Sequence, residues 1–227
     1  VTIISSIGII KCLWSRDLFP KNYKMKATTE NIAIYWGAFN PPTLAHAQVI
    51  SEVIKQQKAS HIILNPSWER EDKTFWISPE KRKRIMEIFC KVLHDAWNNI
   101  SLETHFLEWK NIGLTTTTWE EKYFREKLWV SPSFIFGTDV AANMSWWSNN
   151  ENRFIQERLK KIFIKRPGFD FDFQANDFRA YSFLDIPDML DISSTLAREM
   201  LKNKQSVEGI LFPEIAKEIQ EEQLYQE

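Results

Sequence analysis

Short apolar runs alternate with helical patterns along most of the chain, and this alternation restricts the fold more than any other feature of the sequence. The apolar runs have the length of buried strands. The segments between them place apolar residues at helical spacing, and one of them opens with Ser78 as a cap before Pro79. Alternating strands and helices predict a parallel sheet with helices on both faces, an α/β Rossmann-like fold.

The expected elements can be given by residue range. Strands are predicted at residues 32–36, 61–64, 100–103, 133–136, 162–164 and 182–186. Helices are predicted at residues 43–58, from Ser78 onward, and at 115–127, 194–203 and 213–225.

Length and composition limit the class of protein. The chain has 227 residues, and residues 31–227 are expected to form a single domain. Its 29 basic residues nearly balance its 30 acidic ones, so net charge indicates neither a nucleic acid nor a membrane partner. Two cysteines provide no disulfide framework and no metal-binding spacing, which favours a reducing, cytoplasmic location.

The amino-terminal segment, residues 1–30, is read as an extension of this domain. Its apolar run at residues 1–13 is too short to span a membrane. Met25 stands shortly before the first expected strand, and whether the residues before it belong to the native chain stays open.

The stretch between the first strand and the first helix is crowded with special residues: Gly37, Asn40, two prolines, Thr43 and His46. Thr43 can cap the helix, and His46 three residues later faces the same helix end. Backbone N–H groups at a helix start attract phosphate, and Gly37 would let the backbone approach it closely. The stretch predicts an anion site, although each residue alone fits an ordinary cap or an ordinary histidine.

A second stretch, "DISSTLARE" at residues 191–199, carries similar chemistry. Ser193, Ser194 and Thr195 lead into a helix that carries Arg198 one turn later. Hydroxyls, N–H donors and a cation are the groups that bind a polyphosphate. Taken alone, this stretch is equally a capped helix with a charged face.

Taken together, the two stretches resemble the nucleotidyltransferase superfamily with the His-x-Gly-His signature. The closest likeness within it is to the nicotinate/nicotinamide mononucleotide adenylyltransferases. "FIFGTD" followed by "MSWW" is similar to that family's strand, Gly-x-Asp and downstream Trp. "IFIKRPGF" is similar to its strand followed by Arg-Pro-Gly. The order of these pieces matches from about residue 31 to the last helix.

The resemblance implies adenylyl transfer from ATP to nicotinate or nicotinamide mononucleotide, which yields the dinucleotide and pyrophosphate in NAD biosynthesis. Mg²⁺ is expected to enter with ATP, and no protein metal ligands are expected. The catalytic phosphate contacts implied are His46, Thr43 and Arg198. The ATP-binding residues implied are Gly37, Ala38, Phe39, Gly137, Asp139, Ser193, Ser194 and Thr195. The mononucleotide-binding residues implied are Trp147 (with Trp146 as the alternative), Thr116, Thr117, Lys73 and Arg166.

The reaction suits these residue types. A phosphate monoester has a second pKa near about 6, so the attacking phosphate is largely ionised at neutral pH and requires no general base. Positioning and charge stabilisation would supply the rate.

The sequence departs from the family pattern at several positions. Asn40 stands where many bacterial members have Asp, and Thr43 replaces the first His. Ala45 stands where many members have Gly, which adds a methyl group near the expected phosphate. Asp72-Lys73 stands in place of a common His-Lys pair.

The choice of acceptor stays open at this stage, with nicotinate favoured over nicotinamide mononucleotide. Another phosphorylated acceptor, such as phosphopantetheine in adenylyl or cytidylyl transfer, is an alternative. A degenerate, non-catalytic nucleotide-binding sensor is a second alternative. A homo-oligomer is compatible with the many aromatic residues, but no interface can be located.

Overall fold

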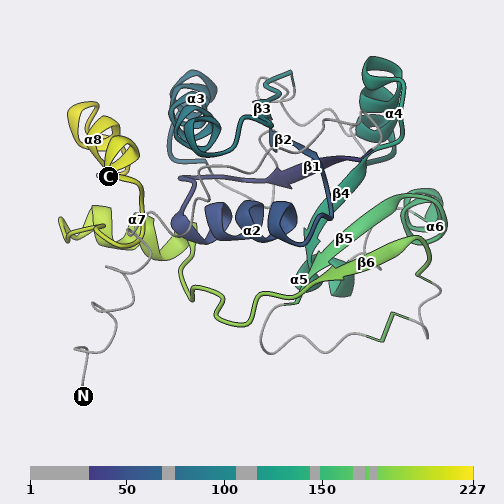
Figure 1. Cartoon of the computed structure of the whole chain (residues 1–227). Helices are drawn as coiled ribbons and strands as arrows, with labels where there is room; N and C mark the ends of the chain where they lie inside the picture. Colours follow the sequence, from purple (N-terminus) through teal and green to yellow (C-terminus); the bar gives the residue numbers. More distant parts are fainter. Residues whose placement is uncertain are drawn as a thin grey trace.

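Six parallel strands form one sheet in the order β3-β2-β1-β4-β5-β6, which confirms the expected Rossmann-like fold (Figure 1). The computed structural model describes residues 31–67, 75–105, 117–143, 149–165, 172–173 and 178–226. The strands are β1 (Ile32–Gly37), β2 (His61–Pro66), β3 (Ile100–Leu102), β4 (Ser133–Gly137), β5 (Lys160–Ile164) and β6 (Tyr181–Leu184). The helices are α2 (Leu44–Lys55), α3 (Pro79–Ala96), α4 (Thr117–Leu128), α5 (Thr138–Asn143), α6 (Asn149–Glu157), α7 (Ser194–Lys202) and α8 (Pro213–Glu221).

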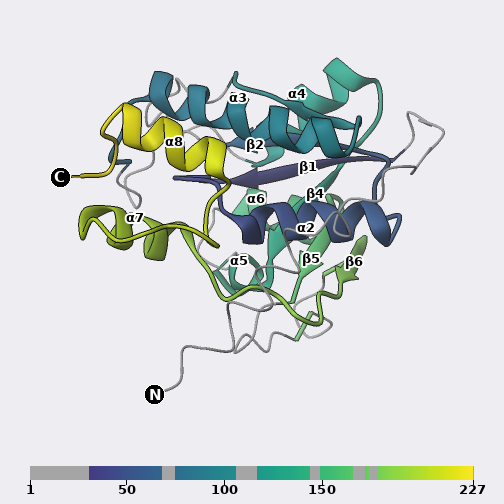
Figure 2. The same cartoon turned by 60° about the vertical axis from the view of Figure 1, so that its left-hand side comes forward.

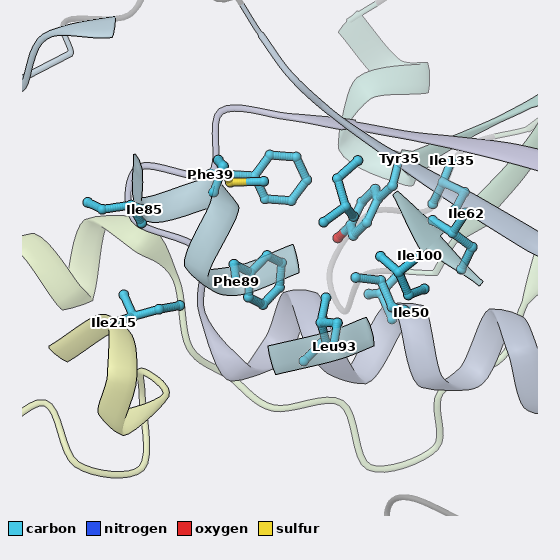
Figure 3. Close-up of a cluster of buried hydrophobic side chains, with 14 of the residues drawn as sticks. Tyr35, Phe39, Ile50, Ile62, Ile85, Phe89, Leu93, Ile100, Ile135 and Ile215 are labelled. Atoms are coloured by element: carbon cyan, nitrogen blue, oxygen red, sulfur yellow. The ribbon is translucent and has the colours of Figure 1, made fainter. Parts of the chain in front are cut away.

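Side chains of the strands alternate between two hydrophobic cores, one on each face of the sheet. On one face, residues such as Tyr35 and Ile62 pack with buried residues of α2, α3, α7 and α8. Figure 3 shows this core, to which α3 contributes Phe89 and α8 contributes Ile215. On the other face, Ile34 and its neighbours pack with α4, α5 and α6.

The strand order reverses between β1 and β4, and this is where ligands bind in open α/β sheets. β1 pairs with β2 on one side and with β4 on the other. Tyr35 pairs with Ile135, so Gly37 and Gly137 both stand two residues further on, at the carboxyl ends of the two strands. Gly37 and Gly137, both predicted as site residues, therefore lie at the ends of neighbouring strands where the strand order reverses.

Two short helices, α5 and α6, were not among the expected elements, and β5 begins two residues earlier than expected. The second residue of β5, Lys161, is an unexpected buried cation. This lysine lies inside the sheet with only 2% of its surface exposed. Its ammonium donates to the carbonyls of Ile155, Gln156 and Leu159 at the end of α6. A cation at a helix C-terminus satisfies the last carbonyls and opposes the helix dipole.

The C-terminal helices α7 and α8 return to the carboxyl end of β1 (Figures 1 and 2). Gln48 of α2 holds the segment that leads into α7. Its amide donates to the Asp188 carbonyl at 2.8 Å and accepts from the Leu190 N–H at 2.9 Å. Among the described residues, no helix is long and apolar enough to cross a membrane.

Candidate active site

The loop after β1 is shaped by Phe39, whose backbone has a positive φ of 45° and whose side chain is 1% exposed. Its ring packs 5.0 Å from the His46 ring and edge-on to Tyr35 at 5.3 Å. A Cβ atom at Gly37 would lie only 3.2 Å from the Phe39 ring. Gly37 therefore makes room for Phe39, in addition to any close approach to a ligand.

Thr43 and His46 form a hydrogen-bonded pair at the start of α2. The Thr43 N–H donates to His46 Nδ1 at 3.0 Å, and the Thr43 hydroxyl lies 2.8 Å from the same nitrogen. A backbone N–H can only donate, so Nδ1 is the accepting nitrogen and the ring proton resides on Nε2. Thr43 is wholly buried, whereas His46 is half-buried.

This burial changes the role expected of Thr43. The resemblance implies that Thr43 contacts phosphate, but a side chain with 0% exposure cannot reach a ligand in this arrangement. Its hydroxyl instead contacts Nδ1 and helps to orient the imidazole, while the Thr43 N–H sets the tautomer.

Several backbone amides at the start of α2 are bonded within the protein. The Leu44 N–H donates to the Ile210 carbonyl at 2.9 Å. Those of His46 and Ala47 donate to the Thr43 carbonyl at 3.1 and 3.3 Å. The expectation that this helix end turns its amides toward phosphate is therefore not met for these three groups, and anion binding here would depend more on side chains.

Carbonyl groups of the loop after β1 accept hydrogen bonds from three side chains of other elements. Arg82 of α3 donates to the Ala38 carbonyl at 2.9 Å. Arg198 of α7 donates to the Asn40 carbonyl at 2.6 Å. The Ser194 hydroxyl, at the start of α7, donates to the Pro41 carbonyl at 2.8 Å. Carbonyl oxygens repel phosphate, so turning them toward protein donors leaves a loop surface better suited to an anion.

The start of α7 adds hydroxyls and a cation to the same loop. Ser193 caps the helix by accepting from the Leu196 N–H at 3.1 Å. Arg198 also donates to the Thr195 hydroxyl at 3.2 Å, and its guanidinium carbon lies 6.0 Å from the centre of the Trp76 ring. Partial burial lowers the pKa of Arg198 below its usual value, although an arginine stays charged at any physiological pH.

The structure places most of the predicted ATP-binding residues around one edge of the sheet. Gly137 ends β4, and Asp139 lies in the first turn of α5 directly after it. Thr117 is the first residue of α4 on the opposite face of the sheet from α2. Four predicted mononucleotide contacts, together with the alternative Trp146, lie outside the described residues: Trp147, Thr116, Lys73 and Arg166.

Two residues that the sequence did not single out also belong to this site. Arg82 is 2% exposed and donates to the Ser67 carbonyl after β2 at 2.7 Å, so it joins the loops after β1 and β2. Tyr225 donates its hydroxyl to Asn40 Oδ1 at 2.6 Å. Both come from positions far from the loop in sequence. "SPEKRKRIMEIFC", which contains Arg82, resembles a helix of the adenylyltransferases, but that resemblance assigns Arg82 no role, and no pattern marks Tyr225.

Comparison with known proteins agrees with this geometry. A family model described as cytidylyltransferase-like matches residues 34–200. The probable nicotinate-nucleotide adenylyltransferase of Staphylococcus haemolyticus is 30% identical over 196 residues, which cover 86% of this chain and 96% of that relative. The nicotinate-nucleotide adenylyltransferase of Bacillus subtilis is 23% identical over 209 residues, which cover 87% and 99% of the two chains.

A solved structure shares the fold. Plasmodium falciparum nicotinic acid mononucleotide adenylyltransferase, complexed with NaAD, has a TM-score of 0.72 at 22% identity and covers 86% of this chain and 97% of its own. With the family model spanning most of the chain and a relative at 30% identity, the chain belongs to the cytidylyltransferase-like family and, within it, to the nicotinate-nucleotide adenylyltransferases.

Proposed function

We infer that this chain transfers the adenylyl group of ATP to nicotinate mononucleotide, which forms the dinucleotide of NAD biosynthesis and releases pyrophosphate. The observation that carries this proposal is the His46 pair at the β1/β4 switch point, beside the loop that Arg198 holds. Polyphosphate needs donors and cations at the carboxyl edge of the sheet, and these residues provide both.

The reaction replaces one phosphoric anhydride bond by another. An oxygen of the mononucleotide phosphate bonds to the α-phosphorus of ATP, while the bond to the oxygen that leaves with pyrophosphate breaks. The attacking phosphate is already ionised near neutral pH, so the protein has no proton to remove. His46 would donate from Nε2 to an oxygen of the reacting phosphates, where negative charge develops.

Mg²⁺ is proposed to arrive with ATP and to bridge its phosphates, where it would neutralise part of their charge. Histidine and arginine donors with hydroxyls suit phosphate oxygens better than they suit a cation. The described part of the chain contains no group of three or more His, Cys, Asp or Glu side chains placed to hold a metal ion.

The mononucleotide is proposed to bind on the side of the sheet where α4 begins, near Thr117. Thr116, Lys73, Arg166 and Trp147 remain proposed contacts from the family resemblance. Nicotinate is preferred over nicotinamide in this proposal because the named relatives use the nicotinate form.

A cytoplasmic location and a homo-oligomer remain predictions.

The test is pyrophosphate release by the purified protein with ATP, Mg²⁺ and either nicotinate or nicotinamide mononucleotide. We expect turnover with both or with nicotinate alone, and a higher kcat/KM for nicotinate mononucleotide. No release with either, alongside measurable ATP binding, would favour another phosphorylated acceptor such as phosphopantetheine. Failure with that acceptor too would favour the non-catalytic sensor.

The role of His46 is tested by His46→Ala. Loss of one preorganised donor to the developing charge should lower kcat by about 10²–10³-fold. His94 is exposed near the end of α3 and provides a matched control, since His94→Ala should leave kcat unchanged. Equal turnover of His46→Ala and wild type would remove the proposed phosphate contact.

A further inference from the structure

Two residues of the segment after α8, Leu224 and Tyr225, are buried, and Tyr225 reaches the loop that follows β1. Leu224 and Tyr225 are 4% and 3% exposed and belong to the core that also contains α2 and α3. The Tyr225 hydroxyl donates to Asn40 Oδ1 at 2.6 Å, and Asn40 itself is 2% exposed. The buried Tyr225 thus places its one polar side-chain atom, the hydroxyl oxygen, against the amide side chain of Asn40.

Asn40 is held at two places at once. Its side-chain oxygen accepts from Tyr225, and its backbone carbonyl accepts from Arg198 at 2.6 Å. Fixing the side chain restricts the residue's backbone, and so fixes where its carbonyl points. The position of that carbonyl decides where the Arg198 guanidinium rests.

The electrostatic surroundings keep Tyr225 in the form that donates. Burial raises the pKa of Tyr225 above its usual value, although the nearby guanidinium groups of Arg82 and Arg198 oppose this shift. The phenol therefore stays protonated across the working pH range. An amide oxygen is the matching acceptor, because it takes the hydrogen bond without adding a negative charge beside the phosphate site.

We propose that Tyr225 is a positioning residue for ATP: it fixes Asn40, and through the Asn40 carbonyl it fixes the Arg198 guanidinium and the loop after β1. The proposal rests on the proposed function for its kinetic readout.

The substitution Tyr225→Phe removes only the hydroxyl and keeps the buried ring. We expect the KM for ATP, and the Kd of a non-hydrolysable ATP analogue, to rise about tenfold, which corresponds to the loss of one buried hydrogen bond. The KM for the mononucleotide should stay unchanged, since that substrate binds on another side of the sheet. Tyr181→Phe is the matched control, because Tyr181 lies on β6 beside the core of the opposite face, and it should behave as wild type.

A double-mutant cycle separates positioning from stability. Asn40→Ala removes the acceptor, so adding Tyr225→Phe to it should raise the ATP KM no further. A purely structural role would lower the unfolding midpoint and the active fraction but leave the ATP KM and the analogue Kd unchanged, and would overturn the proposal. Additive effects in the cycle, or a Tyr225→Phe variant that matches wild type, would overturn it as well.

Failure of the proposed function would look different. If the wild type binds the ATP analogue but turns over neither mononucleotide, the acceptor is wrong, and the ratio of analogue Kd values between Tyr225→Phe and wild type still decides the positioning role. A tenfold ratio supports it, and a ratio of one contradicts it.

Discussion

His46 shows how far a local pattern can predict a site residue. The spacing between Thr43 and His46 predicts that both lie at one helix end, and the structure places them there. The spacing could not predict that Thr43 is wholly buried, because burial depends on the tertiary fold; the neighbouring Leu44 N–H, for example, donates to the carbonyl of Ile210, far away in the sequence. The Ala45 methyl, expected near phosphate, is likewise only 6% exposed and packs inside.

The first prediction concerns the orientation of His46, since a change of the Thr43 side chain to Val or Ser keeps the Thr43 N–H that sets its tautomer. Thr43→Val keeps the shape of Thr43 but removes the hydroxyl that contacts Nδ1, so we expect kcat to fall about tenfold, the value of about one hydrogen bond. Thr43→Ser retains the hydroxyl and should keep most of the activity. Steady-state kinetics on both variants decides the matter, and equal kcat values for Val and Ser would argue against an orienting hydroxyl.

Asn40 and Tyr225 illustrate what a sequence pattern cannot reveal. The hydrogen bond that joins them spans 185 positions, and no residue type near either one signals the other. Arg82 is similar, since it reads as one of several charges on a surface helix but is 2% exposed and donates to two loops. Contacts of this kind follow from the tertiary fold.

At the scale of elements, all six strands were predictable because each is a short apolar run. The helices α5 and α6 were not. The segment that forms α6, "NNENRFIQE", is mostly polar and carries too few apolar residues to show helical spacing. Its end is instead stabilised by Lys161, a residue that a sequence reading assigns to the surface.

The second prediction concerns that helix end. Lys161→Met fills a similar volume but removes the donor to three backbone carbonyls, of which that of Gln156 keeps a bond from the Arg179 N–H at 2.8 Å. We therefore expect the free energy of unfolding to fall by about 3 kcal/mol. Its neighbour Lys160 is exposed, and Lys160→Met should change stability by less than about 0.5 kcal/mol. Urea denaturation provides both values. Equal stabilities of the two variants would contradict the assignment.

The third prediction is the pH dependence of the same lysine. Burial lowers the pKa of Lys161 to about 8 from a usual value of 10.5. Between these two values the unfolded chain binds a proton that the folded chain has lost, so the free energy of unfolding rises with pH in this interval. The stability difference between wild type and Lys161→Met should therefore grow from pH 8 to pH 10. A constant difference would mean that the three carbonyls keep the ammonium protonated.

At the scale of the whole molecule, the two ends of the described chain share one core. Ile50 of α2, Phe89 of α3 and Ile215 of α8 belong to the same buried cluster (Figure 3). Because α7 and α8 do not form a separate unit, we expect the domain to unfold in a single cooperative step.

The fourth prediction tests this cooperativity. Ile215 is fully buried, so Ile215→Ala should lower the free energy of unfolding by about 2–5 kcal/mol, and Ile215→Val by about 0.5–1.5 kcal/mol. Circular dichroism and tryptophan fluorescence should report the same urea midpoint for each variant. Separate midpoints would show that α8 detaches before the sheet unfolds.

The bond between Ser194 and the Pro41 carbonyl joins positions 153 residues apart, and Tyr225 reaches Asn40 from farther still. During translation, β1 and α2 leave the ribosome long before these partners have been synthesised. A nascent chain therefore carries the loop after β1 before Arg198, Ser194 and Tyr225 can hold its Asn40 and Pro41 oxygens. We expect nucleotide affinity to appear late in synthesis, so that ribosome-bound fragments ending before Ser194, which lack all three partners, neither sequester ATP nor release pyrophosphate.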